Sequence, residues 1–557
     1  MQSAHRVSRP WAALAIAVLV FAAVAFIRLR LAGAPLERDE GEYAYAGQLI
    51  LHGIPPYQAA YNMKLPGTYA AYAALMAVFG QSVNGIHTGM LLVNGGAVLF
   101  LFLLGRRLFS SAAGLAAGAC YALLSACPDI LGTSAHATHF VVLPALAATL
   151  LLLRGLESGR LEPLFLDASG RARPAPTAGG NHATVALAFL FWSGVLYGVG
   201  FVMKQHGVFL GAFGAAILAG RAFSRAQAGV SWRRRARPML VFLAGAALPF
   251  ALTCLILWRA GVFHKFWFWT FDYARAYVSQ VSLSEGMENF WDNFAPIVKP
   301  NLTIWLLAAA GLTLAWLRPD FRRHAPFLTA FPLFSCAAMC PGLYFREHYF
   351  ILALPAVCLL AGGGVEFLAK MSRPFFPYCI LAAALAWSLY AQRDFFFHMT
   401  PVESSRRMYQ MSPFPEAVEV AGYIRGHSAR DARIAVLGSE PEIYFYARRR
   451  SATGYIYSYP LMEAQPLALR MQNEMIGEIE AARPEYVVIV NVVWIRDEDS
   501  PGRIFDWWDS YRSRYQRVGV ADMISEERTE YRWDAAAAPE AYAPESELYL
   551  AVYRRRE

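Results

Sequence analysis

The sequence has few charged residues: they make up 16% of its 557 positions, whereas about 25% is usual in soluble proteins. The deficit is uneven, because apolar blocks of about 15–22 residues recur from Trp11 to Gln392 and then stop. A soluble core of this size would show short amphipathic elements instead. In lipid, a helix satisfies every backbone amide within its own segment. The composition therefore excludes an ordinary soluble protein and predicts a polytopic α-helical membrane bundle.

Cysteine is also scarce. All seven cysteines lie in or beside apolar blocks, and none follows residue 392. They show neither zinc-ligand spacing nor a disulfide framework. We therefore predict no metal site and no cofactor, while a divalent metal stays open. The turn at Gly438 lacks a G-x-G-x-x-G or Walker pattern, so it does not support a nucleotide site.

The apolar blocks predict about eleven spanning helices. They lie near 11–31, 67–80 with 85–104 (one long or broken element), 112–127, 139–153, 185–202, 206–220, 239–258, 301–317, 327–342, 349–367 and 377–392. The first block could be read as a cleaved signal peptide. Arg28 and Arg30, just before the small residues around Ala34, favour a retained anchor instead.

Arginine and lysine gather in alternate loops, and this sets the expected orientation. One set of loops holds Arg6, Arg9, Arg106, Arg107, Arg154, Arg160, Arg171, Arg173, Arg221, Arg225, Arg233, Arg234, Arg235, Arg237, Arg318, Arg322, Arg323, Lys370 and Arg373. The positive-inside rule makes this set cytoplasmic. The N-terminus is then inside, and an odd number of spans places residues after about 393 outside. The net charge of +9 follows from this topology and does not indicate nucleic acid.

We expect three parts. Residues 1–395 form a membrane module with outer loops at 32–66 and 260–300, residues 396–410 a linker, and residues 411–557 a C-terminal extracytoplasmic α/β domain. The first loop is typical of one or two short helices at the membrane surface. The second is rich in aromatic residues, which fits either a plain interfacial belt or a surface that guides a lipid substrate. The segment 168–182 has the composition of a flexible cytoplasmic loop.

The C-terminal part shows strand patterns at 433–438, 486–493, 515–522 and 547–554, with a helical stretch around 465–482. Ser439 is a candidate helix N-cap before Pro441. This alternation predicts a small layered α/β domain. Glu440, Tyr444 and Tyr455 could be surface residues that contact an acceptor, or could only pack the fold.

Two adjacent carboxylates, Asp39 and Glu40, follow the first span. Burying carboxylates at the mouth of a helical bundle is costly, so such residues are expected to contact water, to form ion pairs or to serve in binding or catalysis. One of them, held near Arg38, could stay ionised and accept a proton from an attacking hydroxyl. A solvated loop is the alternative interpretation.

Three cations are expected on the same face as Asp39. Lys64 precedes the second span, Lys204 interrupts the apolar run between the fifth and sixth blocks, and Arg346 lies in a short loop. Each alone is more typical of a snorkelling or helix-end residue. Together, near a carboxylate base at the headgroup level, they would suit an anionic lipid phosphate.

The ordered set of Asp39-Glu40 with Tyr43, Lys64-Leu65-Pro66, Lys204, and Arg346 with Tyr349 resembles the GT-C superfamily of glycosyltransferases. It is most similar to the protein mannosyltransferase-like group that includes the bacterial aminoarabinose transferases. The resemblance covers roughly residues 10–395. It implies inverting transfer of a sugar from a polyprenyl-phosphate donor to an acceptor hydroxyl on a lipid, protein or polysaccharide. The reaction would take place on the extracytoplasmic face of the bacterial inner membrane.

By this resemblance Asp39 would be the base, and Glu40 would support it or contact the substrate. Lys64, Lys204 and Arg346 would bind the donor phosphate and stabilise charge on it as it leaves. The remaining candidates for substrate binding are Arg38, Tyr43, Asp129, His139, Tyr344, His348 and Tyr349.

Two departures from the family pattern argue against a role specific to aminoarabinose. Met63 stands where those transferases often have an acid, and residues 134–139 lack the second acid of the family. Asp129 could replace that acid, while His139 could bind the acceptor or cap a helix.

Two other functions compete with a transferase. A flippase of lipid-linked sugars would predict ionisable residues near the bilayer midplane and paired, broken helices. A membrane receptor with an outer ligand-binding domain would leave the Asp39 segment without a purpose.

Overall fold

The computed structural model describes residues 10–158, 180–224, 230–319, 321–373, 375–491, 500–534 and 539–556. Some positions named in the sequence analysis lie outside the described residues. They are Arg6, Arg9, Arg160, Arg171, Arg173, Arg225 and most of the 168–182 loop. The chain divides into two compact units that alternate along the sequence. Unit 1 comprises residues 1–30, 87–256 and 278–398, and unit 2 comprises residues 31–86, 257–277 and 399–557.

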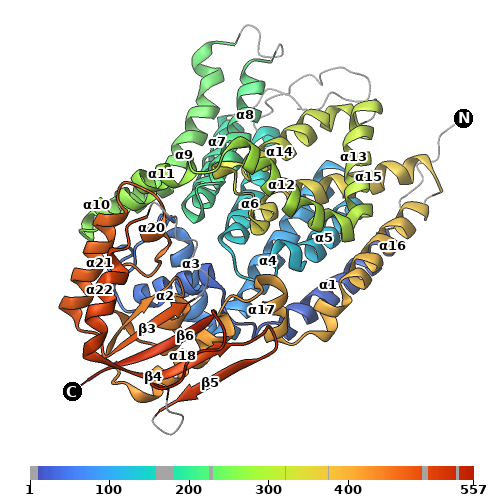
Figure 1. Cartoon of the computed structure of the whole chain (residues 1–557). Coiled ribbons are helices and arrows are strands. Elements are labelled where there is room, and N and C mark those ends of the chain that lie inside the picture. The colour runs from blue at the N-terminus through green and yellow to red at the C-terminus, as the bar shows by residue number, and fades with distance from the viewer. Residues whose placement is uncertain are drawn as a thin grey trace, which may run out of the picture. The chain divides into compact units, whose positions relative to one another are not determined.

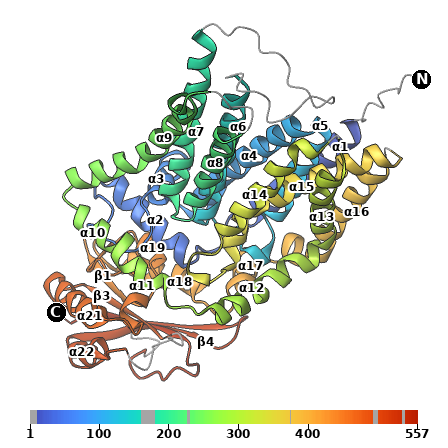
Figure 2. The same cartoon turned by 90° about the horizontal axis from the view of Figure 1, so that it is seen from above.

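The described part of unit 1 is helical (Figure 1). Its helices are α1 (Pro10–Arg30), α5 (Ser111–Leu124), α6 (Ala137–Ser158), α7 (Gly180–Met203), α8 (Gly207–Ala222), α12 (Leu283–Val298), α13 (Leu302–Leu317), α14 (Ala325–Ala337), α15 (Leu354–Met371) and α16 (Phe376–Ala391), with most of α4 (Val83–Leu108) and α9 (Trp232–Arg259). Helices α6, α7 and α8 lie side by side (Figure 2). Short 3-10 segments include η1 (Pro128–Ile130), η6 (Pro341–Leu343) and η7 (Glu347–Leu352).

Seven helical segments among the described residues are long and apolar enough to cross a membrane. They are Trp11–Arg30, Val83–Leu108, Ala137–Ser158, Ala183–Met203, Trp232–Arg259, Leu283–Leu317 and Leu354–Met371, and four shorter apolar helices are Gly67–Phe79, Ser111–Leu124, Gly207–Ala222 and Phe376–Ala391. The predicted polytopic helical bundle is thus confirmed. The element expected over 67–80 with 85–104 is two helices, α3 (Gly67–Phe79) and α4. They separate at Gly80, whose φ of 91° does not continue a helix.

Close backbone approach holds two helices of unit 1 together. A Cβ atom on Gly311 of α13 would lie 2.1 Å from the carbonyl oxygen of Leu360 in α15. A Cβ atom on Gly364 of α15 would lie 2.3 Å from the carbonyl oxygen of Leu307. Since lipid offers no hydrophobic drive for helix association, small residues that admit such contact are a main source of packing energy.

A buried arginine joins α1 to α5. Arg28 lies in the last turn of α1, and its Nη2 donates to the carbonyl oxygen of Ser125 at 2.6 Å. Ser125 is the C-cap of α5, where helix carbonyls lack internal partners and carry partial negative charge. The contact therefore compensates part of the cost of burying the guanidinium.

Unit 2 contains a six-stranded mixed sheet in the order β2-β1-β3-β6-β4-β5. Its strands are β1 (Arg433–Leu437), β2 (Arg450–Ser451), β3 (Tyr486–Asn491), β4 (Tyr515–Met523), β5 (Thr529–Trp533) and β6 (Tyr549–Arg555). Strand β1 pairs in parallel with β2 and β3, whereas β3–β6, β6–β4 and β4–β5 are antiparallel. The four strands predicted from sequence are confirmed, and β2 and β5 were missed.

The helices of unit 2 come from all three of its segments. They are α2 (Arg38–Leu51), α3, α10 (Phe263–Trp267), the π-helix η3 (Phe268–Tyr273), most of α11 (Ala274–Val278), α17 (Pro401–Tyr409), α18 (Phe414–His427), α19 (Glu442–Ala447), α20 (Tyr459–Met462), α21 (Ala468–Ala482) and α22 (Arg503–Tyr511). The expectation for Ser439 is wrong, because α19 begins at Glu442 and Pro441 occupies the N-cap position.

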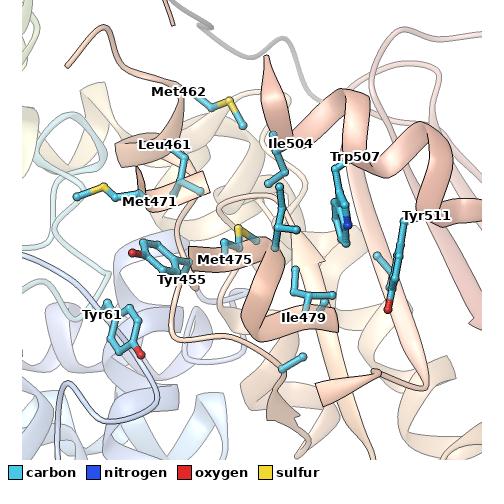
Figure 3. Packing of buried hydrophobic residues seen from close by; sticks show 14 of the residues in the cluster. Tyr61, Tyr455, Leu461, Met462, Met471, Met475, Ile479, Ile504, Trp507 and Tyr511 are labelled. Atoms are coloured by element: carbon cyan, nitrogen blue, oxygen red, sulfur yellow. The ribbon is translucent and has the colours of Figure 1, made fainter. Parts of the chain in front are cut away.

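One hydrophobic core joins the three segments of unit 2. Tyr61 from the first segment, together with Trp269 and Tyr273 from the second, packs with residues of the third such as Tyr455 and Met475. Figure 3 shows Tyr61 beside Tyr455, and the two ring centroids are 5.2 Å apart. Three rings of the 260–300 loop, those of Phe266, Trp269 and Tyr273, are therefore buried in this unit and do not form a lipid-facing belt.

The three residues considered for the surface of the C-terminal domain are also buried. Glu440, Tyr444 and Tyr455 are at most 2% exposed. They pack the fold and do not present a free surface to an acceptor.

We predict that Gly311→Ala lowers the stability of the bundle by about 1–3 kcal/mol, because the obstacle to its methyl group is backbone that cannot rotate away. Gly220→Ala in α8 is the matched control, since nothing lies within 4 Å of its Cβ position. The control should be neutral or slightly stabilising. Thermal unfolding of the detergent-solubilised protein measures both, and equal melting temperatures would contradict the packing argument.

Candidate active site

The N-terminus of α2 is closed by a pair of glutamates. The Glu40 backbone N–H donates to Glu37 Oε1 at 2.9 Å, and the Glu37 backbone N–H donates to Glu40 Oε2 at 3.3 Å. This reciprocal arrangement is a capping box, and carboxylates are favoured at this end of a helix. Burial, and then the charges of Asp39 and Glu40, raises the pKa of Glu37 well above its usual value. Glu40 is fully buried and holds the turn that presents Asp39.

Asp39 and Glu42 lie three residues apart on α2, so their side chains share one face of the helix. Lys64 bridges them, with its Nζ 2.6 Å from Asp39 Oδ1 and 2.7 Å from Glu42 Oε2. The side chain of Asp39 is 24% exposed, whereas that of Glu42 is 1% exposed. Of the two carboxylates, Asp39 is therefore the one that a substrate can reach.

Aromatic and amide groups surround this ion cluster. The Tyr457 hydroxyl donates to Asp39 Oδ1 at 2.9 Å, and Lys64 Nζ lies 4.7 Å from the ring centroid of Tyr43. Glu42 accepts hydrogen bonds from the Tyr69 hydroxyl and, at 2.8 Å, from Asn62 Nδ2. These contacts fix both carboxylates and the ammonium group in one arrangement.

The charges oppose the effect of burial on Lys64. Burial by itself lowers the pKa of Lys64, but the carboxylates of Asp39 and Glu42 outweigh it, and the pKa is raised overall. Burial raises the pKa of Glu42, and Lys64 opposes that shift. Lys64 thus stays a cation at neutral pH.

Arg38 is not the partner of Asp39 that the sequence suggests. Its Nη2 lies 2.9 Å from Glu440 Oε1, and its Nε donates to the Ser439 carbonyl oxygen at 2.7 Å. Its guanidinium also lies 5.1 Å from the ring centroid of Tyr459. Arg38 therefore ties the first turn of α2 to the C-terminal segment of unit 2, and Lys64 is the cation beside Asp39.

A buried glutamate lies against the same turn. A Cβ atom on Gly41 of α2 would be 2.6 Å from the Cβ of Glu442 in α19, so only glycine admits this approach. Neither carboxylate oxygen of Glu442 accepts a hydrogen bond from another described residue. Burial, and then the charge of Glu440, raises the pKa of Glu442 well above its usual value. Glu442 thus packs α19 closely against the first turns of α2.

A second cluster lies in unit 1. Lys204, in the turn between α7 and α8, has its Nζ 3.4 Å from His348 Nε2 and 4.1 Å from the ring centroid of Tyr349. His136 stacks on His348 with ring centroids 4.2 Å apart. The structure thus brings together Lys204, His348 and Tyr349, three residues singled out from the sequence.

The other candidates of unit 1 lie in nearby elements. The Arg346 guanidinium lies 5.5 Å from the ring centroid of Tyr344. Asp129 is half-buried in η1, which packs against η7. His139 is buried in the first turn of α6. Asp39 and Lys64 belong to unit 2 and Lys204 and Arg346 to unit 1, so the convergence of these four residues stays a prediction.

Sequence reasoning missed several members of the Asp39 cluster. Glu42 carries a readable signal, because its spacing from Asp39 is that of neighbours on one helix face. Asn62 and Tyr69 flank Lys64 in the sequence and could have been included with it. Tyr457 lies more than 400 residues from Asp39, and no sequence pattern links the two.

No known protein-family model and no curated protein matches the chain. Among solved structures, the chain is similar to ArnT from Cupriavidus metallidurans in the apo state, with a TM-score of 0.56 and 13% identity over 96% of this chain and 97% of that one. It is also similar to the same protein bound to undecaprenyl phosphate, with a TM-score of 0.55 and 14% identity over 97% of each chain.

A third similar structure is the archaeal oligosaccharyltransferase AglB from Archaeoglobus fulgidus, in complex with an inhibitory peptide and a dolichol-phosphate. Its TM-score is 0.53, with 12% identity over 95% of this chain and 75% of that one. The chain has the GT-C fold. At these identities the likeness concerns the GT-C fold itself, and any reaction depends on the residues that this chain places in its site.

We predict that Glu442→Gln stabilises the protein at neutral and alkaline pH. The raised pKa means that Glu442 contributes most to stability when protonated, and the folded state loses stability as pH rises from the usual glutamate range toward that raised pKa. The variant should gain roughly 1–3 kcal/mol at about pH 8 and little at about pH 4. Melting temperatures across this range test it.

Glu419→Gln is the matched control, because Glu419 is an exposed residue of α18. A gain that is the same at both pH values, or that appears equally in the control, would contradict a buried and destabilising Glu442.

Proposed function

We propose that the chain is a membrane glycosyltransferase that moves a sugar from a polyprenyl-phosphate-linked donor to an acceptor hydroxyl, with inversion and with Asp39 as the base. The observation that carries the proposal is the partly exposed Asp39, hydrogen-bonded by Lys64 and Tyr457 on a buried helix. The fold supports it, since similar structures include ArnT bound to undecaprenyl phosphate and AglB in complex with a dolichol-phosphate.

In the proposed reaction the acceptor hydroxyl attacks the anomeric carbon of the donor sugar while Asp39 takes the hydroxyl proton. The bond between that carbon and the phosphate oxygen breaks on the opposite face, so the configuration inverts. The phosphate leaves as an anion and needs positive charge but no proton. One base and a set of cations therefore suffice for this chemistry.

Lys64 has two parts in this scheme. Two of its three N–H groups bond to Asp39 and Glu42, which holds the base in place. We assign the third N–H to the donor phosphate. Glu40 supports Asp39 through the capping box, and the ring of Tyr43 forms one wall beside Lys64.

Lys204 and Arg346 are the proposed cations that bind the donor phosphate and stabilise the charge it gains on leaving. Each lies against an aromatic ring, Tyr349 for Lys204 and Tyr344 for Arg346, which restricts the position of the charge. His348, Asp129 and His139 are assigned to substrate binding around them. The loop charges support a site on the extracytoplasmic face, with the N-terminus in the cytoplasm. The membrane we propose is the inner membrane of a bacterium.

We predict that Asp39→Asn lowers sugar transfer at least about 100-fold, because the amide cannot take the proton of the acceptor hydroxyl. The assay is transfer from a polyprenyl-phosphate sugar by the purified protein. Glu40→Gln is the matched control, since glutamine also completes a capping box. It should keep most of the activity, and an Asp39→Asn variant that folds and turns over normally would rule out Asp39 as the base.

We predict that Lys204→Ala and Arg346→Ala each raise the KM for the donor roughly 10- to 100-fold, as expected for the loss of a charge-assisted contact. Arg259→Ala is the control, because Arg259 is an exposed cation at the end of α9. The KM of the control should not change. Donor binding that survives both substitutions would refute the assignment of these cations to the phosphate.

A further inference from the structure

A cavity of about 290 Å³ lies within unit 2, separate in its lining residues from the Asp39 cluster. Its wall combines the second half of α2, the segment that follows this helix, and the paired strands β1 and β2. The residues that matter for its chemistry are Tyr45, Leu49, Gln58, Arg433, Arg450 and Ser451. None of them takes part in the proposed transfer.

Two arginines face the cavity from neighbouring strands. Arg433 of β1 and Arg450 of β2 are Cα partners in the parallel pairing, so two like charges stand side by side. Such a pair is unfavourable in a sheet. Among the described residues neither guanidinium forms an ion pair with a carboxylate, and the nearby Glu485 pairs with Arg554 instead. The contact of Arg433 with the Ser451 carbonyl oxygen, at 3.4 Å, does not neutralise either charge.

Other arginines of unit 2 do form an ion pair with a carboxylate. Arg38 pairs with Glu440, and Arg406 pairs with Glu416. Arg433 and Arg450 are exposed, like Arg425 and Arg430, which also lack a carboxylate partner among the described residues, but only Arg433 and Arg450 line the cavity. The pair at 433 and 450 therefore combines adjacent positive charges with a cavity that is open to solvent on one side.

A buried phenol adds a donor to the two cations. The Tyr45 hydroxyl accepts a hydrogen bond from the Ser451 backbone N–H at 2.8 Å, which leaves its own proton available to a ligand. Burial raises the pKa of Tyr45 to about 12, so the hydroxyl is protonated at neutral pH. Gln58 offers a further amide, while Leu49 gives the cavity an apolar wall.

We propose that this cavity is a binding site for a phosphate ester carried by the acceptor. Two guanidinium groups and a phenol match the several oxygens of a phosphate, which arginine binds in a bidentate manner. The volume equals that of roughly ten water molecules, enough for a phosphate and part of a sugar ring but not for a lipid chain.

The cavity and Asp39 share the helix α2. Tyr45 follows Asp39 by six residues on the same helix, a rise of about 9 Å along its axis. Six residues also turn the helix by about 600°, so Tyr45 projects roughly 120° around α2 from Asp39, and an acceptor that reaches both must extend around the helix. The inference rests on the proposed function and names its acceptor as a phosphorylated glycan.

The test is equilibrium dialysis of the full-length purified protein in detergent, with radiolabelled inorganic phosphate and, separately, glucose 1-phosphate. The double variant Arg433→Gln/Arg450→Gln should bind both probes at least about 10-fold more weakly, because both guanidinium contacts are lost. The control Arg425→Gln/Arg430→Gln removes the same charge from equally exposed positions of unit 2 that do not line the cavity, and it should bind as the native protein does.

The two probes separate the sources of the phosphate. Glucose 1-phosphate should bind several-fold more tightly than inorganic phosphate, and equal affinities would overturn the assignment to a glycan ester. Unchanged binding by the double variant, or an equal loss in the control, would overturn the site itself. Asp39→Asn should keep the affinity for glucose 1-phosphate, so a failure of the transfer mechanism is distinguished from a failure of this site.

Discussion

One ammonium group shared by two carboxylates organises the region around Asp39. Asp39 and Glu42 would repel each other on one face of α2, and Glu42 is almost fully buried, so an uncompensated charge there would cost several kcal/mol. Lys64 offsets both the repulsion between the two carboxylates and the buried charge of Glu42, because its loop folds back over the helix. The loop is fixed in that position by the Tyr57 hydroxyl, which donates to the Lys64 carbonyl oxygen, and by the Tyr61 N–H, which donates to the Gly454 carbonyl oxygen.

The C-terminal residues help to build this region. Tyr457 reaches Asp39, Glu440 pairs with Arg38, and Glu442 lies against Gly41 at the start of α2. The core around Tyr455 includes aromatic rings from the segments 31–86 and 257–277. The α/β domain is thus a structural part of the unit that carries Asp39, and its strands β1 and β2 supply the two arginines of the proposed phosphate site.

Local rules explain what could be predicted from the sequence. Apolar blocks predicted the helices, and alternation with helical patterns predicted four strands. Lys64 was expected near the carboxylates as a cation for the donor phosphate, whereas its direct ion pairs with Asp39 and Glu42 were not predicted. Strand β2 has two residues, too few for a pattern. One of the carboxylates Asp39 and Glu40 was expected to be held near Arg38, whereas folding brings Arg38 to Glu440, about 400 residues away. Tyr457 was missed for the same reason, since long-range contacts leave no local mark.

The proposed reaction is a single displacement in which Asp39 acts only as a base, and the configuration of the product records whether that happens. The most direct measurement is the anomeric configuration of the transferred sugar, determined by NMR spectroscopy after incubation of the purified protein with a polyprenyl-phosphate sugar of known configuration. The account predicts a configuration opposite to that of the donor. A product with the donor's configuration would require a covalent sugar intermediate and would contradict the role given to Asp39.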